Sequence, residues 1–225
     1  MSFFIKLIET TDSERRSLES IPKVHSMIHH GLTLHEYQVF LHDMYHLVWH
    51  FCPIMAAAAS RCGDQFRQVR YGLYENIEGE KGHEAWVLDD IQAVGGDAEH
   101  AKATLPSIPM QSLIAFNYHT VERVHPCSVI GMLYTLEVVS SVYGARIASA
   151  ISRSTGIAGP RGFSFLDSHA SMDKDHVAKL TELVKTINDP SAQQAVINTT
   201  RINFWMFGQL FLQPALNQPA TAMLA

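Results

Sequence analysis

The chain has 225 residues, of which 47% are hydrophobic, and its formal net charge is −5. This length allows one full core, so we expect a single domain over residues 1–225, with a loose tail over residues 213–225. Because the balance of charge is slightly acidic, we expect no nucleic-acid partner. We find no apolar run near the roughly 20 residues of a membrane span, so we expect no membrane association.

The cysteines and the first residues predict a cytoplasmic protein. Cys52, Cys62 and Cys127 are odd in number and not paired by spacing, which is typical of a reducing compartment. The apolar start is interrupted at Lys6, too early for a secretory signal. The 13 histidines, against 17 Lys and Arg, raise the expectation of metal or proton chemistry.

Helix signals follow one another through the first half of the chain. Pro22 suits the first turn of a short helix that stops at Gly31, and Thr33-x-x-Glu36 is a capping box that opens a long apolar-periodic helix. The helices expected next are one capped by Asp64 that runs through Ile77, one over residues 84–94, and a short one between Asp97 and Pro106.

The second half continues the helical pattern. Glycines and a proline predict a loop at residues 156–162, and Asn188-Asp189-Pro190 predicts a stop. The helices expected here are residues 109–124, 127–154, 164–187 and 191–212. No segment has a convincing strand pattern. The fold class that follows is all-α, a single-domain bundle of about seven helices.

The most specific chemical signal is His169-x-x-x-Asp173-x-x-His176. Steps of four and three residues return to nearly the same face of a helix, so the three side chains would project in one direction. Imidazole and carboxylate are usual ligands of iron, manganese and zinc. The plainer alternative is a polar helix face exposed to solvent.

Glu137 is the second signal. It is the only formally charged residue between Arg123 and Arg146, on a helix that is apolar on all sides. A helix of that kind is usually buried, and a lone buried carboxylate is costly unless it is paired, protonated or bound to a metal. The alternative to a metal ligand is a buried ion pair, for example with Arg146.

Glu80-x-x-His83 is the third signal, with the i, i+3 spacing of bundle-core di-metal carboxylate sites. Alone it is weak, because Gly79 and Gly82 disfavour a helix and the nearby acids could form a solvated turn. Together the three segments supply three carboxylates and three imidazoles. This mixed donor set suits two metal ions.

A second histidine series, His42, His46 and His50, repeats every fourth residue. It is either a ligand stripe or a half-buried polar face. We single out His46 and the neighbouring Tyr45 as candidate catalytic residues near the site, with Tyr45 as a hydrogen-bond donor or redox neighbour.

At these residues the chain resembles the haem-oxygenase-like di-iron oxidases, which are relatives of the TenA and PqqC proteins, from about Pro22 to Phe207. The first ligand helix of that family often contains Asn-Leu-x-x-Glu followed by a histidine, which is similar to Asn76-Ile-Glu-Gly-Glu80 and His83 here. The short Glu-to-His spacing is most similar to the branch of terminal-alkene-forming fatty-acid oxidases. The segments 45–51 and 86–97 also look like the family.

The resemblance implies a seven-helix bundle that is frequently a homodimer. It implies two ferrous ions, with manganese possible instead of iron, and O₂ as co-substrate. The metal ligands that it implies are Glu80, His83, Glu137, His169, Asp173 and His176. The expected activity is oxidation of a small organic molecule, whether a fatty acid, an amino acid or an amine.

Three other functions stay open at this point. One is a metal-free TenA-type aminopyrimidine hydrolase with Cys127 as nucleophile. Another is a haem oxygenase with His25 as the axial ligand of the haem. The third is a metal-binding bundle without enzymatic activity. The first two leave the six-residue ligand set unused.

Overall fold

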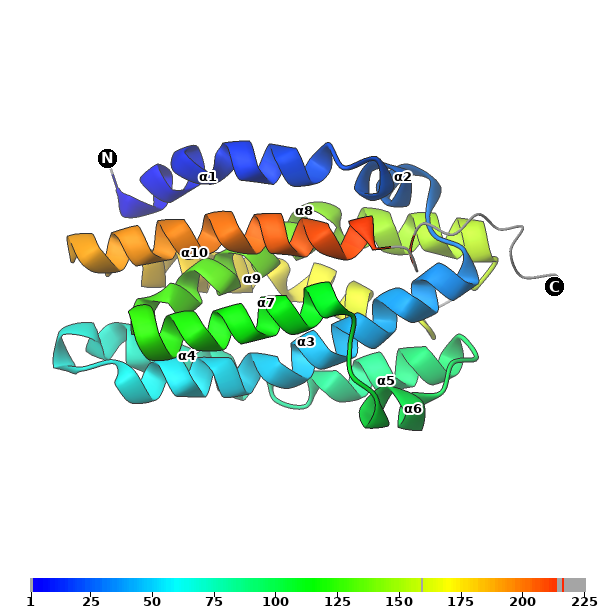
Figure 1. The fold of residues 1–225 in the computed structure, drawn as a ribbon, viewed down its shortest axis with the longest axis horizontal. Helices are drawn as coiled ribbons and strands as arrows, with labels where there is room; N and C mark the ends of the chain where they lie inside the picture. Colours follow the sequence, from blue (N-terminus) through cyan, green and yellow to red (C-terminus); the bar gives the residue numbers. More distant parts are fainter. Residues whose placement is uncertain (1, 159, 214–215, 217–225) are drawn as a thin grey trace.

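The computed structural model of the protein describes residues 2–158, 160–213 and 216, with their side chains except those of residues 169–176. The described residues form ten α-helices and no strand, which confirms the predicted all-α class (Figure 1). The helices are α1 (Phe3–Glu19), α2 (Pro22–His30), α3 (Leu34–Arg61), α4 (Arg67–Glu80), α5 (His83–Ala93), α6 (Ala98–Ala103), α7 (Ile108–His119), α8 (Val129–Thr155), α9 (Ser164–Lys185) and α10 (Pro190–Gln209). Short helical turns lie at Asp64–Phe66, Thr120–Val124, Pro126–Ser128 and Leu210–Leu212.

Two of the predicted caps begin helices where the sequence places them. At the start of α3, the backbone N–H of Thr33 donates to Glu36 at 2.8 Å and the N–H of Glu36 donates to Thr33 Oγ1 at 3.3 Å. Asp97 accepts from the N–H of His100 at 2.9 Å and begins α6. Asp64 instead opens a 3₁₀ turn, and α4 begins after Phe66 without a side-chain cap.

Helix α1 was not predicted. It lies along α10 at one edge of the bundle (Figure 1). Arg201 of α10 donates to the carbonyl of Thr10 at 3.1 Å and its Nε lies 3.3 Å from a carboxylate oxygen of Glu14. Phe3, Leu7 and Leu18 are buried beneath it. These contacts show that α1 is an integral layer of the fold.

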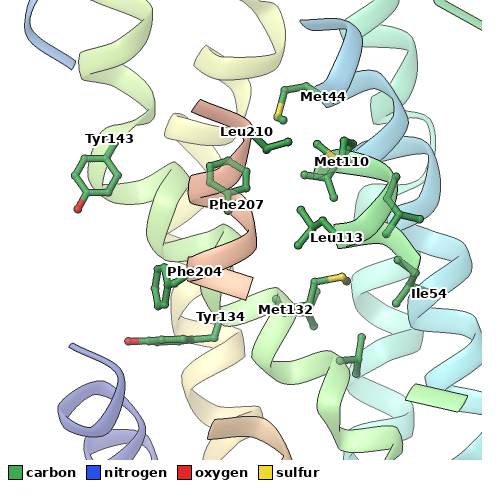
Figure 2. Packing of buried hydrophobic residues seen from close by; sticks show 14 of the residues in the cluster. Met44, Ile54, Met110, Leu113, Met132, Tyr134, Tyr143, Phe204, Phe207 and Leu210 are labelled. Carbon is green, nitrogen blue, oxygen red and sulfur yellow. The ribbon is translucent and has the colours of Figure 1, made fainter. Parts of the chain in front are cut away.

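Helix α8 crosses the core between α9, α10 and α2. Gly131 allows its close approach to α10, since a Cβ at this position would lie 2.6 Å from the carbonyl oxygen of Val196. Figure 2 shows the aromatic and aliphatic side chains that fill the space between α8, α10 and the helices beside them, among them Tyr134, Phe204 and Met132. This packing holds the side of α8 that carries Glu137 at a fixed place.

One described helical stretch, Pro126–Thr155, is long and apolar enough to cross a membrane, although we expected none. Its most apolar window has a mean hydropathy of 1.3, and 61% of that window is buried inside the bundle. A core helix of a globular protein passes the same test. The apolar character of α8 is therefore explained by its place in the core.

Candidate metal centre

A cavity of about 110 Å³ lies inside the bundle. Its lining comes from seven helices, and the polar members of the described lining are Glu80, Glu137, Ser140 and Tyr143. The apolar members are Leu18, Val24, Met27, Phe40, Met44, Leu47, Val48, Phe51, Leu136, Val139, Gly144, Ile147, Phe165, Leu166, Phe207 and Phe211. Two of the six predicted ligands, Glu80 from α4 and Glu137 from α8, thus meet at one otherwise apolar cavity.

Glu80 and His83 form a buried pair at the junction of α4 and α5. Each residue is 5% exposed, and His83 Nδ1 lies 2.9 Å from Glu80 Oε2. The sequence predicted one helix through Ile77 and another over residues 84–94, and the structure extends both, so that Glu80 is the last residue of α4 and His83 is the first residue of α5. Gly82 makes the break possible with φ of +90°, a conformation that costs glycine little. The chain therefore turns between the two side chains and still brings them into contact.

The imidazole of His83 is fixed on its other side by Trp86. The two rings are stacked with their centroids 3.9 Å apart and an interplanar angle of 20°. His83 does not itself line the cavity, but its partner Glu80 does. The contact with Trp86 therefore orients a histidine that lies directly behind the carboxylate at the cavity wall.

Glu137 occupies the middle of α8, where it is half-buried. Its neighbours along the cavity are Leu136, Val139 and Ser140 from the same helix. Arg146, which the sequence analysis named as one example of an ion-pair partner, is exposed to solvent further along α8.

The predicted ligands His169, Asp173 and His176 lie outside the described side chains. Helix α9, which carries them, begins at the cavity, because Phe165 and Leu166 line it. Among the side chains that the structure does describe, no three His, Cys, Asp or Glu gather closely enough to hold a metal ion. The complete ligand set therefore stays a prediction, of which the described part is Glu80, His83 and Glu137.

Tyr45 and His46 are not in the cavity wall. The cavity takes Phe40, Met44 and Phe51 from α3, whereas the His46 ring contacts the rings of Tyr45 and His42, each with centroids 5.1 Å away. On this second face of α3, His42 Nε2 lies 2.9 Å from Thr104 Oγ1 and His50 Nδ1 lies 3.0 Å from the hydroxyl of Tyr118. The catalytic role of Tyr45 and His46 therefore stays a prediction, because neither residue lines the cavity.

The residues required by two of the alternative functions also lie apart from the cavity wall. Cys127 is 0% exposed, and a hydrogen bond with Cys62 together with burial raises the pKa of its thiol. A thiol held in its protonated form is a poor nucleophile. His25, the candidate haem ligand, is exposed on α2, where its ring packs on that of His29. Neither residue lines the cavity.

Cys52 is a neighbour of the centre that the sequence analysis did not find. Burial, and then the charges of Glu80 and Glu84, raise the pKa of its thiol to about 11. Its Sγ faces the carbonyl of Ile77 at 3.9 Å, within the last turn of α4. In the sequence Cys52 is 28 positions before Glu80, and only the packing of α3 on α4 brings the two together.

Solved structures with the same arrangement of helices define the class of fold. A domain of unknown function from Shewanella denitrificans with a heme oxygenase-like fold has a TM-score of 0.82 at 20% identity, over 92% of this chain and 89% of that chain. A TenA homolog from Pseudomonas syringae has a TM-score of 0.79 at 15% identity, over 95% and 92%. A heme oxygenase from Leptospira interrogans has a TM-score of 0.71 at 18% identity, over 94% and 98%. At these identities the likeness shows the haem-oxygenase-like fold alone.

The family follows from the sequence profile that the chain matches. Residues 38–206 match the profile of a family described as iron-containing redox enzymes, and the protein belongs to that family. A comparison with curated proteins gave no match. Oxidoreductase chemistry with iron is therefore shown at the level of the family.

Proposed function

We propose that this protein is a non-haem di-iron enzyme that uses O₂ to oxidise a small organic substrate. The observation that carries the proposal is the meeting of Glu80 and Glu137, from helices distant in sequence, at one apolar cavity, with His83 bonded to Glu80. Membership in a family of iron-containing redox enzymes supports the choice of iron.

The donor groups that are present fit iron. Two carboxylates that face an apolar cavity are costly to bury without a cation, and a bound metal offsets that cost. Carboxylate oxygen and imidazole nitrogen are the mixture that non-haem iron accepts, and manganese accepts the same mixture. Glu80, His83 and Glu137 would hold the metal together with His169, Asp173 and His176, whose segment follows the cavity residue Phe165 by four, eight and eleven positions.

When bound, the iron supplies the activation of O₂ and the removal of electrons from the substrate. The protein's own residues supply position and exclusion of water. Phe40, Phe165 and Phe207 contribute apolar wall to the cavity from α3, α9 and α10. The Nδ1–H of His83 donates the hydrogen bond that holds the Glu80 carboxylate in one orientation, because an ionised carboxylate can only accept, and Trp86 holds the imidazole in turn. A ligand whose orientation is fixed from behind binds its metal more tightly.

Anaerobic ferrous titration of the metal-free protein, followed by exposure to oxygen, tests the proposal. We expect two irons per chain, oxygen consumption and a transient visible absorption band. Glu137→Ala and Glu80→Ala should each lose at least one iron. Glu78→Ala is the matched control, because Glu78 also lies in α4 but is exposed and pairs with Lys81.

Retention of two irons in both ligand variants would overturn the ligand assignment. Absence of iron uptake by the wild-type protein would overturn the di-iron proposal itself. Uptake of iron without oxygen consumption would favour the binding bundle over the enzyme. Preferential binding of two manganese ions would change the identity of the metal in the proposal and leave the ligand assignment unchanged.

A further inference from the structure

The described lining of the cavity follows α8 for about three turns. Its lining residues on this helix run from Leu136 to Ile147, and the ten positions from Glu137 to Ile147 span about 15 Å at 1.5 Å per residue. Glu137 lies near the start of this stretch. Toward Ile147 the polar residues of the described lining are Ser140 and Tyr143, and the hydroxyl of Tyr143 is turned to Glu19 of α1.

The far end of the cavity is closed by the first two helices. Leu18 from the end of α1 and Val24 and Met27 from α2 belong to the lining, and each is at most 3% exposed. The matched family profile begins only at residue 38, so this α1–α2 segment (residues 3–30) lies outside the part of the chain that defines the family. The chemistry-bearing glutamates lie inside that part.

The α1–α2 segment is bonded to the rest of the fold at two places. The hydroxyl of Tyr143 on α8 donates to Glu19 at the end of α1, and Arg15 also donates to Glu19. Lys23 at the start of α2 forms an ion pair with Glu36 of α3, whose side chain is 9% exposed. Figure 2 shows the hydroxyl of Tyr143 pointing away from Phe207 and the core. A wall held to both α8 and α3 gives the cavity a defined end.

The charge of the described lining restricts what the cavity can hold. It contains two carboxylates and no Lys or Arg. In the metal-free protein a second anion placed beside these carboxylates would be repelled, whereas an uncharged hydrocarbon segment would bury against the leucines, valines and phenylalanines. The methionines Met27 and Met44 can adjust their shape around such a segment.

We infer that the α1–α2 segment sets the length of the longest uncharged apolar group that the cavity accepts, with Leu18, Val24 and Met27 as its specificity-determining residues. The inference rests on the proposed function in one respect, namely that the substrate reacts at the end that lies beside the proposed metal ligands. The substrate class is an elongated molecule whose hydrocarbon part lies along α8 and whose reacting part lies at Glu80 and Glu137.

Binding of 1-alkanols of increasing length to the metal-free protein, measured by titration calorimetry, tests the inference. Each added methylene should raise the affinity about fourfold until the hydrocarbon chain of the alkanol reaches the α1–α2 segment, after which longer alkanols should bind no better. Val24→Ala and Met27→Ala should move this limit to longer alkanols, and Val24→Phe to shorter ones. At the limiting length, the affinity for the alkanoate should be lower than that for the alkanol by a factor of about ten or more.

Ile28→Ala is the matched control, because Ile28 is a buried residue of the same helix that does not line the cavity. It should keep the wild-type limit. Tyr143→Phe keeps the ring and removes the bond to Glu19, and we expect it to make the limit less sharp. Thermal melts followed by circular dichroism identify any variant that fails to fold, in which case the remaining size variants decide.

A limit that stays unchanged in Val24→Ala and Met27→Ala would overturn the inference, as would an equal shift in Ile28→Ala. Tighter binding of the alkanoate to the metal-free protein would overturn the choice of an uncharged segment. Ferrous titration of the same variants separates the two proposals. If the limit moves but no iron binds, the proposed function fails alone, and if iron binds but the limit does not move, the inference fails alone.

Discussion

Asn117 and Asn203 are a buried pair that joins α7 to α10. Asn117 Nδ2 donates to Asn203 Oδ1 at 2.9 Å, and Asn203 Nδ2 donates back to Asn117 Oδ1 at 3.1 Å. The second hydrogen on each amide goes to a carbonyl of its own helix, those of Leu113 and Thr199. Both side chains are 1% exposed, so neither can turn to water if its partner is removed.

We expect Asn117→Leu to lower the free energy of unfolding by about 2 kcal/mol, because it leaves the Asn203 amide buried without a partner. The second substitution, Asn203→Leu, should cost much less in that background than in the wild-type protein. Chemical denaturation of the two single variants and the double variant measures the coupling. Additive effects would contradict a shared hydrogen-bonded pair.

At this scale the sequence predicted the chemistry of the centre better than its geometry. The placement of Glu137 on an apolar helix and the spacing of Glu80 and His83 were enough to select three residues that the structure brings to or next to one cavity. An interruption between Ile77 and residue 84 was predicted, but its position at Gly82 was not, because a glycine in a helical pattern is compatible both with a weakened helix and with a turn. Cys52 could not be found, since its proximity to Glu80 arises only from tertiary packing.

Helix α3 presents two faces with different roles. One face carries Phe40, Met44 and Phe51 to the cavity, and the opposite face carries His42, His46 and His50 toward α6 and α7. Burial lowers the pKa of all three histidines from the usual value of 6.5. The folded protein therefore holds these imidazoles neutral under conditions in which the unfolded chain would protonate them.

The sign of the pH dependence follows from this shift. A histidine with a lowered pKa in the folded state contributes stability that is present above pH 6.5 and is lost as the pH falls through the folded pKa. We expect the free energy of unfolding to fall between about pH 6.5 and pH 5, and to fall less in His42→Gln/His46→Gln. Denaturation midpoints at both pH values check this. An equal loss in wild type and variant would assign the acid sensitivity to other groups.

The accuracy of the helix predictions depended on local signals. Thr33 with Glu36 and Asp97 carry their caps within three residues, so α3 and α6 begin where expected. Helix α1 lacks such a clear pattern, because its buried residues are sparse along a polar sequence and its contacts are with α10. Most helical stability comes from tertiary packing, which the sequence of one segment does not display. The histidine stripe of α3 was recognised, but the neighbour that it faces was not predictable for the same reason.

For the whole molecule, we expect bound iron to raise thermal stability. A ligand at about 100 times its dissociation constant adds about 2.7 kcal/mol, which for a domain of this size is a rise in Tm of about 5–10 °C. Anaerobic calorimetry of the metal-free and ferrous protein measures the change. Glu137→Ala should lose most of the rise and Glu78→Ala should keep it. An undiminished rise in Glu137→Ala would place the stabilising metal elsewhere.

The all-α class was predictable for the whole molecule because the apolar spacing is helical throughout and no segment alternates as a strand does. The cavity was not predictable. Its residues come from seven helices, and a phenylalanine of the cavity wall has the same pattern in sequence as one of the filled core. The distinction between Phe207 in the wall and Phe204 in the packed interior exists only in three dimensions.

Because the α1–α2 segment lies outside the region that matches the family profile, the two parts of the chain can diverge separately. The glutamates and the wall that limits the cavity lie in different stretches of the chain, so substitutions in residues 3–30 can accumulate without altering the donor groups. Lineages could thus acquire new preferences while inheriting one reaction. An exchange of this segment between two relatives, with the contacts to Tyr143 and Glu36 retained, would then transfer the selectivity for substrate length from one protein to the other.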